Sequence, residues 1–176
     1  ERLKAKCAEL GVGCDIVPKV ELCGITISST YIRGLLSQGE MERANYFLGH
    51  PHTLTGTVNH GKRLGTTLGF PTVNLRFAPG VLSPAHGVYA AKAFLANGES
   101  CLAVTNVGTR PTVDSHGDVN VEGFLLDFDG DLYGQTLRME FYHFLRPEVR
   151  FPTLEALRAA VQEDVKATRR YFQSQG

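Results

Sequence analysis

The sequence predicts a mainly β domain, either an antiparallel barrel or a sandwich, that ends in one long helix. From residue 53 onward, apolar and β-branched runs alternate with turn residues, and no helical pattern separates them. These runs cover residues 53–59, 87–96, 100–107, 119–128 and 135–145. The last segment changes period, because Leu154, Leu157, Val161 and Val165 recur at helical spacing and predict a helix after Thr153.

The first fifty residues differ from the rest and predict a short α/β segment. Residues 1–10 are typical of a helix, and residues 15–22 predict an edge strand, because the run contains a proline. Two further short helices are expected, one capped by Ser28 or Ser29 and one over residues 40–48. These elements supply too few strands for a sheet of their own.

Two turn signals lie within the β region. Asn97-Gly98, between two apolar runs, is a strong signal for a two-residue hairpin loop. Asp127, Asp129 and Asp131 resemble the opening of a calcium-binding EF-hand loop, but the glycine comes too early and Arg138 replaces the bidentate acid. Calcium binding is therefore rejected, and Asp129-Gly130 is interpreted as a tight hairpin turn.

Composition excludes several classes of function for the 176-residue chain. Lysine plus arginine and aspartate plus glutamate both number 18, so the net charge is 0 and a generally basic nucleic-acid surface is not expected. No run approaches the roughly 18 apolar residues of a membrane span, and no signal-peptide pattern opens the chain. The four cysteines lack metal-ligand spacing, which favours reduced thiols in a cytoplasmic protein.

A glycine-rich stretch over residues 56–74 is the first candidate for a phosphate-binding loop. Its start nearly matches the P-loop pattern GxxxxGK[ST], but Arg63 replaces the hydroxyl residue, and Pro71 with the glycines prevents the helix that a P-loop requires. A different loop that holds phosphates remains possible, with Thr72 and Asn74 as hard oxygen ligands for Mg²⁺. The alternative for these two residues is ordinary turn and strand chemistry.

Glu122 is the best-placed carboxylate if the glycine-rich stretch holds a nucleotide. It lies in a run otherwise suited to a buried strand, where a lone carboxylate more often faces solvent. Phosphoryl transfer to an alcohol, however, benefits from a carboxylate that accepts the hydroxyl proton.

Five motifs, in order and sensibly spaced, resemble the riboflavin kinase module over residues 53–172. The motifs are GTVNHGKRLGTTLGFPTVNL, GVYA, NVGTRPT, VEGFLLDFDGDLYG and FLRPEVRF. The preceding residues resemble the end of the adenylyltransferase module and connector of bacterial bifunctional riboflavin kinase/FAD synthetases. The resemblance thus divides the chain into a remnant, residues 1–52, and a kinase domain, residues 53–176, with the rest of the adenylyltransferase module expected in the full-length protein.

The resemblance implies a six-stranded antiparallel Greek-key barrel with a C-terminal helix. It also implies ATP- and Mg²⁺-dependent phosphorylation of the riboflavin 5′-hydroxyl to FMN, with flavin and ATP/ADP as partners. Neither nucleic acid nor membrane is expected as a partner, because of the charge and hydropathy described above. The resemblance assigns ATP binding to Gly61, Thr66, Thr72, Leu125, Asp127 and Tyr133, Mg²⁺ to Thr72 and Asn74, the catalytic carboxylate to Glu122, and flavin binding to Arg146, Val149 and Phe151.

Three positions depart from the family pattern. Val73 replaces the usual alanine, Gly123-Phe124 replaces a pair that ends in histidine, and Thr67 replaces a basic residue that could contact phosphate. The side chain of Val73 is expected to point away from the metal. Two alternative functions are kept: FAD synthesis, which needs the absent module, and a non-catalytic flavin- or nucleotide-binding barrel.

Overall fold

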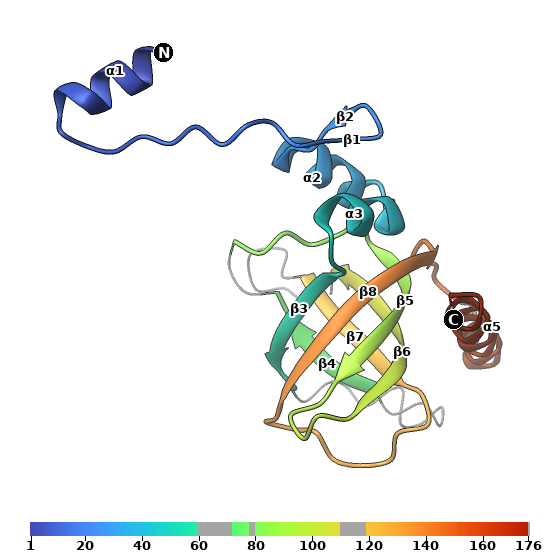
Figure 1. The fold of residues 1–176 in the computed structure, drawn as a ribbon. Helices are drawn as coiled ribbons and strands as arrows, with labels where there is room; N and C mark the ends of the chain where they lie inside the picture. Colours follow the sequence, from blue (N-terminus) through green and yellow to red (C-terminus); the bar gives the residue numbers. More distant parts are fainter. Residues whose placement is uncertain (60–71, 78–79, 110–118, 176) are drawn as a thin grey trace.

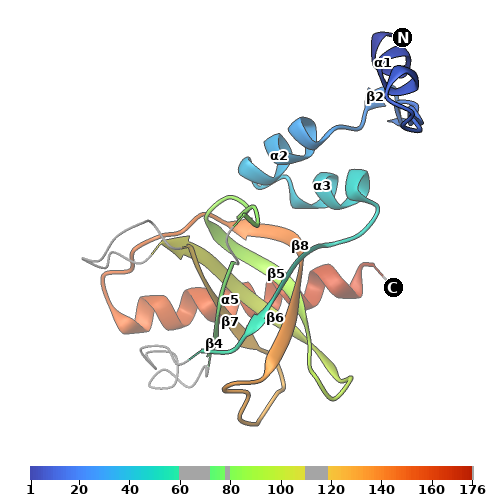
Figure 2. The same cartoon turned by 90° about the vertical axis from the view of Figure 1, so that its left-hand side faces the viewer.

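One curved antiparallel sheet of six strands forms a barrel, and a long helix lies along its outside (Figures 1 and 2). The computed structural model describes residues 1–59, 72–77, 80–109 and 119–175. The elements of the barrel are β3 (His52–Thr57), β4 (Thr72–Arg76), β5 (Gly87–Phe94), β6 (Ser100–Thr109), β7 (Val119–Leu125), β8 (Thr136–Arg146) and the helix α5 (Leu154–Gln173). The predicted six-stranded barrel with a C-terminal helix is confirmed.

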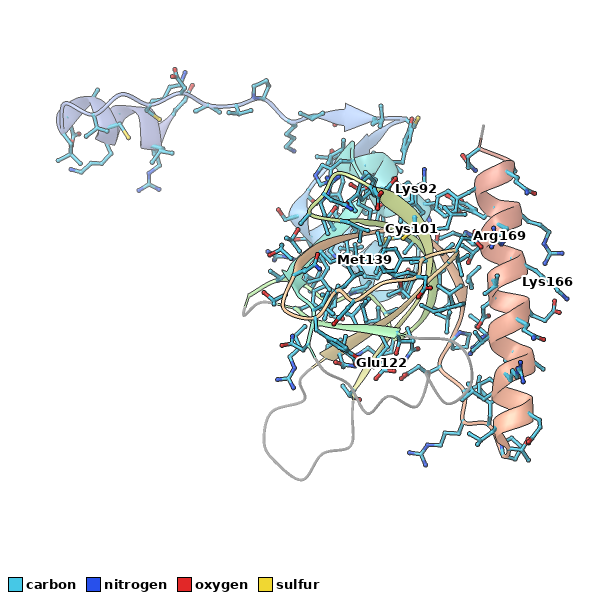
Figure 3. All side chains as sticks on the ribbon, turned by 90° about the horizontal axis from the view of Figure 1, so that it is seen from below. Lys92, Cys101, Glu122, Met139, Lys166 and Arg169 are labelled. Carbon is cyan, nitrogen blue, oxygen red and sulfur yellow. The ribbon has the colours of Figure 1, made fainter. Side chains whose placement is uncertain are left out.

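The strands follow the order β3-β8-β5-β6-β7-β4, and every neighbouring pair is antiparallel. The chain leaves β7 and crosses the barrel, so that β8 pairs with both β3 and β5. Among the described residues, the edge strands β3 and β4 are not paired with each other, and an isolated bridge joins Asn59, two residues beyond β3, to Asn74 of β4. Inward side chains such as those of Tyr89 and Phe141 fill the interior, where Figure 3 shows Met139.

Strand β4 is the one barrel strand that no run in the sequence predicts. Its five residues alternate, with Val73 and Leu75 in the core and Thr72 and Asn74 on the opposite face. Two apolar residues that alternate with three polar ones in a five-residue segment give only a weak periodicity signal. Its pairing with β7, rather than its own composition, defines it as a strand.

The structure changes both turn predictions. The hairpin at Asn97-Gly98 is confirmed, but its loop has three residues: Leu95 N–H donates to the Glu99 carbonyl at 2.8 Å, and Gly98 adopts a left-handed φ of 89°. This is a type I turn followed by a glycine bulge. The prediction of a tight hairpin turn at Asp129-Gly130 is wrong, because β7 and β8 are not neighbours in the sheet.

The N-terminal segment runs away from the barrel (Figure 1). Helix α1 (Arg2–Glu9) agrees with the expected helix, but the strand predicted over residues 15–22 shrinks to β1 (Glu21–Leu22), which pairs with β2 (Ile25–Thr26). Ile16 and Val17 are 56% and 83% exposed. Their apolar side chains gave the strand signal, yet no neighbouring strand in the described chain pairs with them.

Two helices close one end of the barrel (Figure 2). Helix α2 (Ser29–Ser37) begins as predicted at Ser28, whose hydroxyl accepts from Tyr31 N–H at 3.2 Å, and α3 (Met41–Leu48) ends at Gly49, with φ 76°. Apolar residues of both helices belong to the same core cluster as the barrel interior; they are Leu35, Leu36, Met41, Ala44 and Phe47. The predicted division of the chain at residue 52 stays a prediction.

The connection from α3 to β3 is held by one asparagine. The Asn45 amide donates to the Phe141 carbonyl at 2.8 Å, and its oxygen accepts from His52 N–H at 2.7 Å. The His52 ring packs against both Phe77 and Phe141, with centroid distances of 6.4 and 6.0 Å, and these two rings also stack on each other. The Nε2 atom of His52 is buried, and it has no hydrogen-bond partner among the described atoms.

Helix α5 crosses the outer face of β5, β6 and β8. Thr153 begins it, since its hydroxyl accepts from Ala156 N–H at 3.1 Å. Val165 packs on a small cluster of Val88, Val104 and Leu126. Within the described residues, neither α5 nor any shorter helix combines the length and the apolar character that a membrane crossing requires. The cytoplasmic location stays a prediction.

The environment of His52 predicts a specific pH dependence of stability. Burial lowers the pKa of His52 below its ordinary value of 6.5, and a hydrogen bond to the backbone of Leu82 opposes this only in part. Below pH 6.5 the unfolded chain therefore takes up a proton that the folded chain does not, so stability falls by at most about 1.4 kcal/mol per pH unit.

This contribution is measured by urea unfolding between pH 7.5 and 5.5. The variant His52→Phe keeps an aromatic ring in the stack and removes the titration, so its stability should fall less steeply toward acid than that of the parent. His86→Phe, at an exposed position, serves as the control and should keep the parent slope. Equal slopes for all three proteins would contradict the role of His52.

Candidate active site

The candidate site is built on a row of polar side chains across three strands. In the register of the sheet, Glu122 of β7 lies opposite Asn74 of β4 and opposite Asn106 of β6. Because side chains alternate along a strand, Thr72 shares this outer face, whereas Val73 lies in the core. The side chain of Val73 thus points away from the row, as expected.

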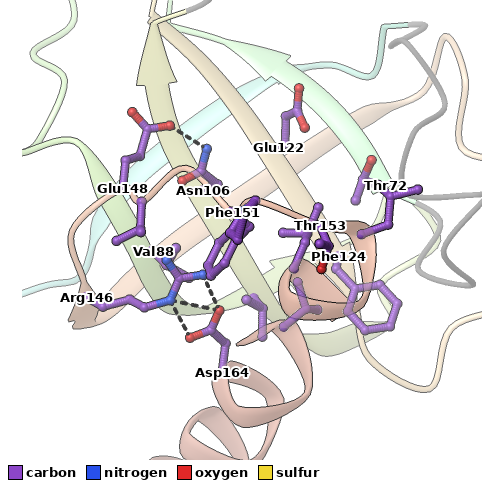
Figure 4. Close-up of a pocket in the computed structure, with 16 residues that line it drawn as sticks. Thr72, Val88, Asn106, Glu122, Phe124, Arg146, Glu148, Phe151, Thr153 and Asp164 are labelled. Carbon is purple, nitrogen blue, oxygen red and sulfur yellow. Dashed lines mark hydrogen bonds and ion pairs between the residues drawn. The ribbon is translucent and has the colours of Figure 1, made fainter. Parts of the chain in front are cut away.

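A cavity of about 520 Å³ lies between this face and the start of α5 (Figure 4). The sheet forms one wall, and the segment that joins β8 to α5, together with the first turns of α5, forms the other. Its apolar lining consists of Val88, Val104, Phe124, Val149, Phe151, Pro152, Leu154, Leu157 and Val161. Its polar lining consists of Thr72, Asn106, Glu122, Arg146, Glu148, Thr153 and Asp164. A few polar groups in an apolar cavity of this size are typical of a small-molecule site.

A largely buried ion pair joins the two walls of this cavity. Arg146, the last residue of β8, donates from Nε to Asp164 Oδ1 at 2.9 Å and from Nη2 to Oδ2 at 2.7 Å. The side chains are 25% and 8% exposed, and the guanidinium also lies 5.4 Å from the centre of the Phe151 ring. The two parallel hydrogen bonds fix the guanidinium plane between β8 and α5.

A second cavity, of about 320 Å³, adjoins the first at Thr72. It lies between β4, the end of β7 and the β7–β8 connection. Its lining consists of Val58, Thr72, Val73, Leu125, Phe128, Asp129, Gly130, Asp131, Leu132 and Tyr133. Thr72 contributes to both cavities, so a ligand in one can meet a ligand in the other beside its hydroxyl.

The polar row offers oxygen atoms suited to a hard cation. Asn120 Nδ2 donates to Glu122 Oε1 at 3.1 Å and lies 3.5 Å from Asn74 Oδ1. Asn74 Oδ1, Glu122 Oε1 and the Thr72 hydroxyl are oxygen ligands of the kind that Mg²⁺ accepts when water and phosphate complete its coordination. Within residues 1–59, 72–77, 80–109 and 119–175, no cluster of three or more histidine, cysteine or acidic side chains offers a metal site.

The cavities bring together most of the residues that the resemblance assigns to binding. Arg146, Val149 and Phe151, assigned to flavin, all line the first cavity, as does Glu122. Leu125 and Tyr133, assigned to ATP, line the second. Gly61 and Thr66 lie outside the described residues.

Asp127 is the exception among the residues assigned to ATP. It is exposed, has a left-handed φ of 58°, and lines neither of the two cavities. Both of its carboxylate oxygens accept from Arg169 of α5 at 2.8 Å, and this hydrogen-bonded pair lowers the pKa of Asp127. The predicted contact with ATP stays a prediction.

Comparison with known proteins identifies the family. The family model described as riboflavin kinase matches residues 48–172. The chain belongs to the riboflavin kinase family. Similar curated proteins are the bifunctional riboflavin kinase/FMN adenylyltransferases of Listeria monocytogenes, 40% identical over 96% of this chain and 53% of that protein, and of Bacillus subtilis, 37% identical over 91% and 51%. The chain spans about half the length of these riboflavin kinase relatives.

Two solved structures share the fold. Riboflavin kinase from Trypanosoma brucei superimposes with a TM-score of 0.52 at 27% identity, covering 69% of this chain and 79% of that one. A Streptococcus pneumoniae protein named a macrolide-efflux protein gives a TM-score of 0.79 at 32% identity, covering 87% and 50%. The riboflavin kinase-like fold agrees with the expectation from the sequence.

Three polar residues of the first cavity in this riboflavin kinase domain were not predicted from the sequence. Asn106 and Glu148 lie in motifs that carry the resemblance, so those motifs were the available signal. Asp164 had no such signal, because a single aspartate in an amphipathic helix is normally solvated. Its burial depends on Arg146, which is 18 residues away in the sequence.

The Arg146–Asp164 pair is expected to be important for the stability of the riboflavin kinase domain. Asp164→Ala leaves a largely buried guanidinium without its carboxylate and should lower the free energy of unfolding by about 3–5 kcal/mol. The adjacent Glu163 forms an exposed pair with Lys166, so Glu163→Ala is the matched control and should change little. Urea unfolding of both variants measures the difference, and equal effects would show that the ion pair is not structural.

Proposed function

We propose that this domain phosphorylates the 5′-hydroxyl of riboflavin with ATP and Mg²⁺ to give FMN. The observation that carries the proposal is the meeting of two cavities at Thr72, with Glu122 on the wall of the larger one. Transfer between two bound substrates needs the acceptor hydroxyl and the γ-phosphate in contact, and adjoining sites supply that proximity.

The first cavity is the proposed flavin site. Its apolar walls and a volume of about 520 Å³ suit a flat aromatic ring system. The guanidinium of Arg146, neutralised by Asp164 and facing Phe151, offers a planar and rigid surface rather than a free charge. A neutral ring such as that of riboflavin fits this environment.

The second cavity is the proposed ATP site. Membership of a kinase family implies ATP use, and Thr72, Leu125 and Tyr133 line the cavity. From here the terminal phosphate can reach the border with the first cavity at Thr72. We further propose that Thr72 and Asn74 hold Mg²⁺, which, when bound, neutralises charge on the phosphates.

Glu122 is the proposed proton acceptor. As the 5′-oxygen attacks the γ-phosphorus and the bond to the leaving ADP oxygen breaks, the hydroxyl proton passes to the Glu122 carboxylate. The hydrogen bond from Asn120 holds one carboxylate oxygen in place and so orients the other. Rigid pairing with β4 and β6 on both sides fixes the backbone at this position.

Two alternatives lead to different products. FAD synthesis from FMN and ATP is the second activity in the names of the bifunctional relatives, and it releases pyrophosphate. A non-catalytic barrel would bind flavin or nucleotide without turnover. Chromatographic separation of FMN and FAD, together with a pyrophosphate assay, distinguishes all three cases.

Replacement of Glu122 tests its role as the proton acceptor. The protein should form FMN from riboflavin, ATP and Mg²⁺, and Glu122→Gln should lower kcat by about 10²–10⁴-fold, because the amide cannot accept the proton. Glu99→Gln, in the exposed β5–β6 hairpin, makes the same chemical change away from both cavities and should keep the parent rate. A folded parent that forms no FMN, or full activity in Glu122→Gln, contradicts the assignment.

Replacement of Thr72 tests its role as a ligand of Mg²⁺. Thr72→Val keeps the shape and strand preference of the residue but removes the hydroxyl oxygen. Half-maximal activity should then require a higher Mg²⁺ concentration, while the riboflavin Kd, measured without nucleotide, stays close to that of the parent. Thr55→Val, exposed on β3, is the control. An unchanged Mg²⁺ requirement would argue against Thr72 as a ligand.

A further inference from the structure

Asn106 lies at the centre of the sheet wall of the first cavity. It is half-buried, and in the register it lies between Val88 of β5 and Glu122 of β7. Its amide nitrogen donates to Oε1 of Glu148 at 2.9 Å (Figure 4). Glu148 belongs to the segment that leads from β8 to α5, so this hydrogen bond links the two walls of the cavity.

The chemistry of this contact determines the orientation of the Asn106 amide. An ionised carboxylate only accepts hydrogen bonds, so the NH₂ group must face Glu148, and the carbonyl oxygen must point away from it. The described part of the chain supplies no donor to that oxygen. An acceptor of fixed orientation is therefore available on the cavity wall.

Glu148 is held over Gly108, two residues further along β6. A Cβ atom at Gly108 would collide with the Glu148 carboxylate. The glycine therefore leaves the space in which the carboxylate reaches Asn106. Any larger residue at this position would push the carboxylate away and release the amide.

We propose that Asn106 binds substrate by accepting a hydrogen bond from a ribityl hydroxyl, and that Glu148 is the positioning residue that orients its amide. The inference rests on the proposed riboflavin kinase function. Directly opposite residues of neighbouring strands have Cβ atoms about 4.5–5.5 Å apart. A polyol whose terminal hydroxyl reaches Glu122 therefore brings its next hydroxyl groups near Asn106. The remaining lining of the cavity is mostly apolar and suits the ring.

The test compares two flavins that differ only in the chain on N10. Riboflavin carries the ribityl group, whereas lumiflavin carries a methyl group and cannot donate from a hydroxyl. Asn106→Ala should raise the riboflavin Kd, measured by flavin fluorescence, by about 3–10-fold, the value of one hydrogen bond, and leave the lumiflavin Kd unchanged. Equal losses for both flavins would overturn the proposal, because a residue that only shapes the cavity affects both.

Exchange of the two side chains tests the part played by Glu148. Asn106→Asp alone sets two carboxylates against each other and should bind riboflavin poorly. In the double variant Asn106→Asp/Glu148→Gln, the new amide donates to the new carboxylate, which again offers an oxygen to the ligand. Riboflavin affinity should then recover, with the KM for ATP unchanged throughout. Failure of the exchange to recover affinity would overturn the positioning role.

Gly108→Ala provides a second route that leaves both side chains intact. It displaces only the end of Glu148, so it should weaken riboflavin binding and spare lumiflavin binding, even if the Asn106 variants do not fold. Turnover of the parent protein is measured separately. If the parent binds riboflavin with these variant effects but forms no FMN, the inference stands and the proposed function fails. If it forms FMN while the variants affect both flavins equally, only the inference fails.

Discussion

The register between β4, β7 and β6 is the constraint on which the rest of the site depends. It sets Asn74, Glu122 and Asn106 side by side on the outer face and directs Val73, Val121 and Val107 into the core. Because side chains alternate along a strand, a slip of one residue would bury Glu122 and turn an apolar residue toward the cavity. Burial of the inner valines makes such a slip costly, so the hydrophobic core itself positions the polar row.

Helix α5 converts this sheet face into an enclosed cavity. Its C-terminal half is packed tightly, with Phe172 5.1 Å from Tyr142 and Tyr171 stacked 4.9 Å from His143. Near its middle, Asp164 anchors the helix to Arg146. The first turns of α5, which precede Asp164, line the first cavity with Leu154, Leu157 and Val161. One helix thus contributes both stability and a binding wall along different parts of its length.

The sequence predicted those features that arise from local chemistry. The serine cap of α2, the extent of α3, the start of α5 and the turn-rich strands all follow from a few neighbouring residues. Strand β4 and the buried Asp164 were missed, because each depends on partners far away in the chain, β7 in one case and Arg146 in the other. The Asp129-Gly130 turn was misread for the same reason, since a local turn signal does not reveal which strands pair. Glu122 was a candidate only in combination with the glycine-rich stretch.

The closure of the barrel by α2 and α3 bears on how the domain can be isolated. Met41 and Ala44 are essentially fully buried, and Asn45 binds the backbone of both β8 and β3. A protein expressed from residue 53 would expose the apolar end of the barrel and leave the Phe141 carbonyl without its side-chain donor. Such a surface favours aggregation. In recombinant work, a shortened form that begins near residue 20 would retain the core together with Leu22 and Ile25, which pack against it.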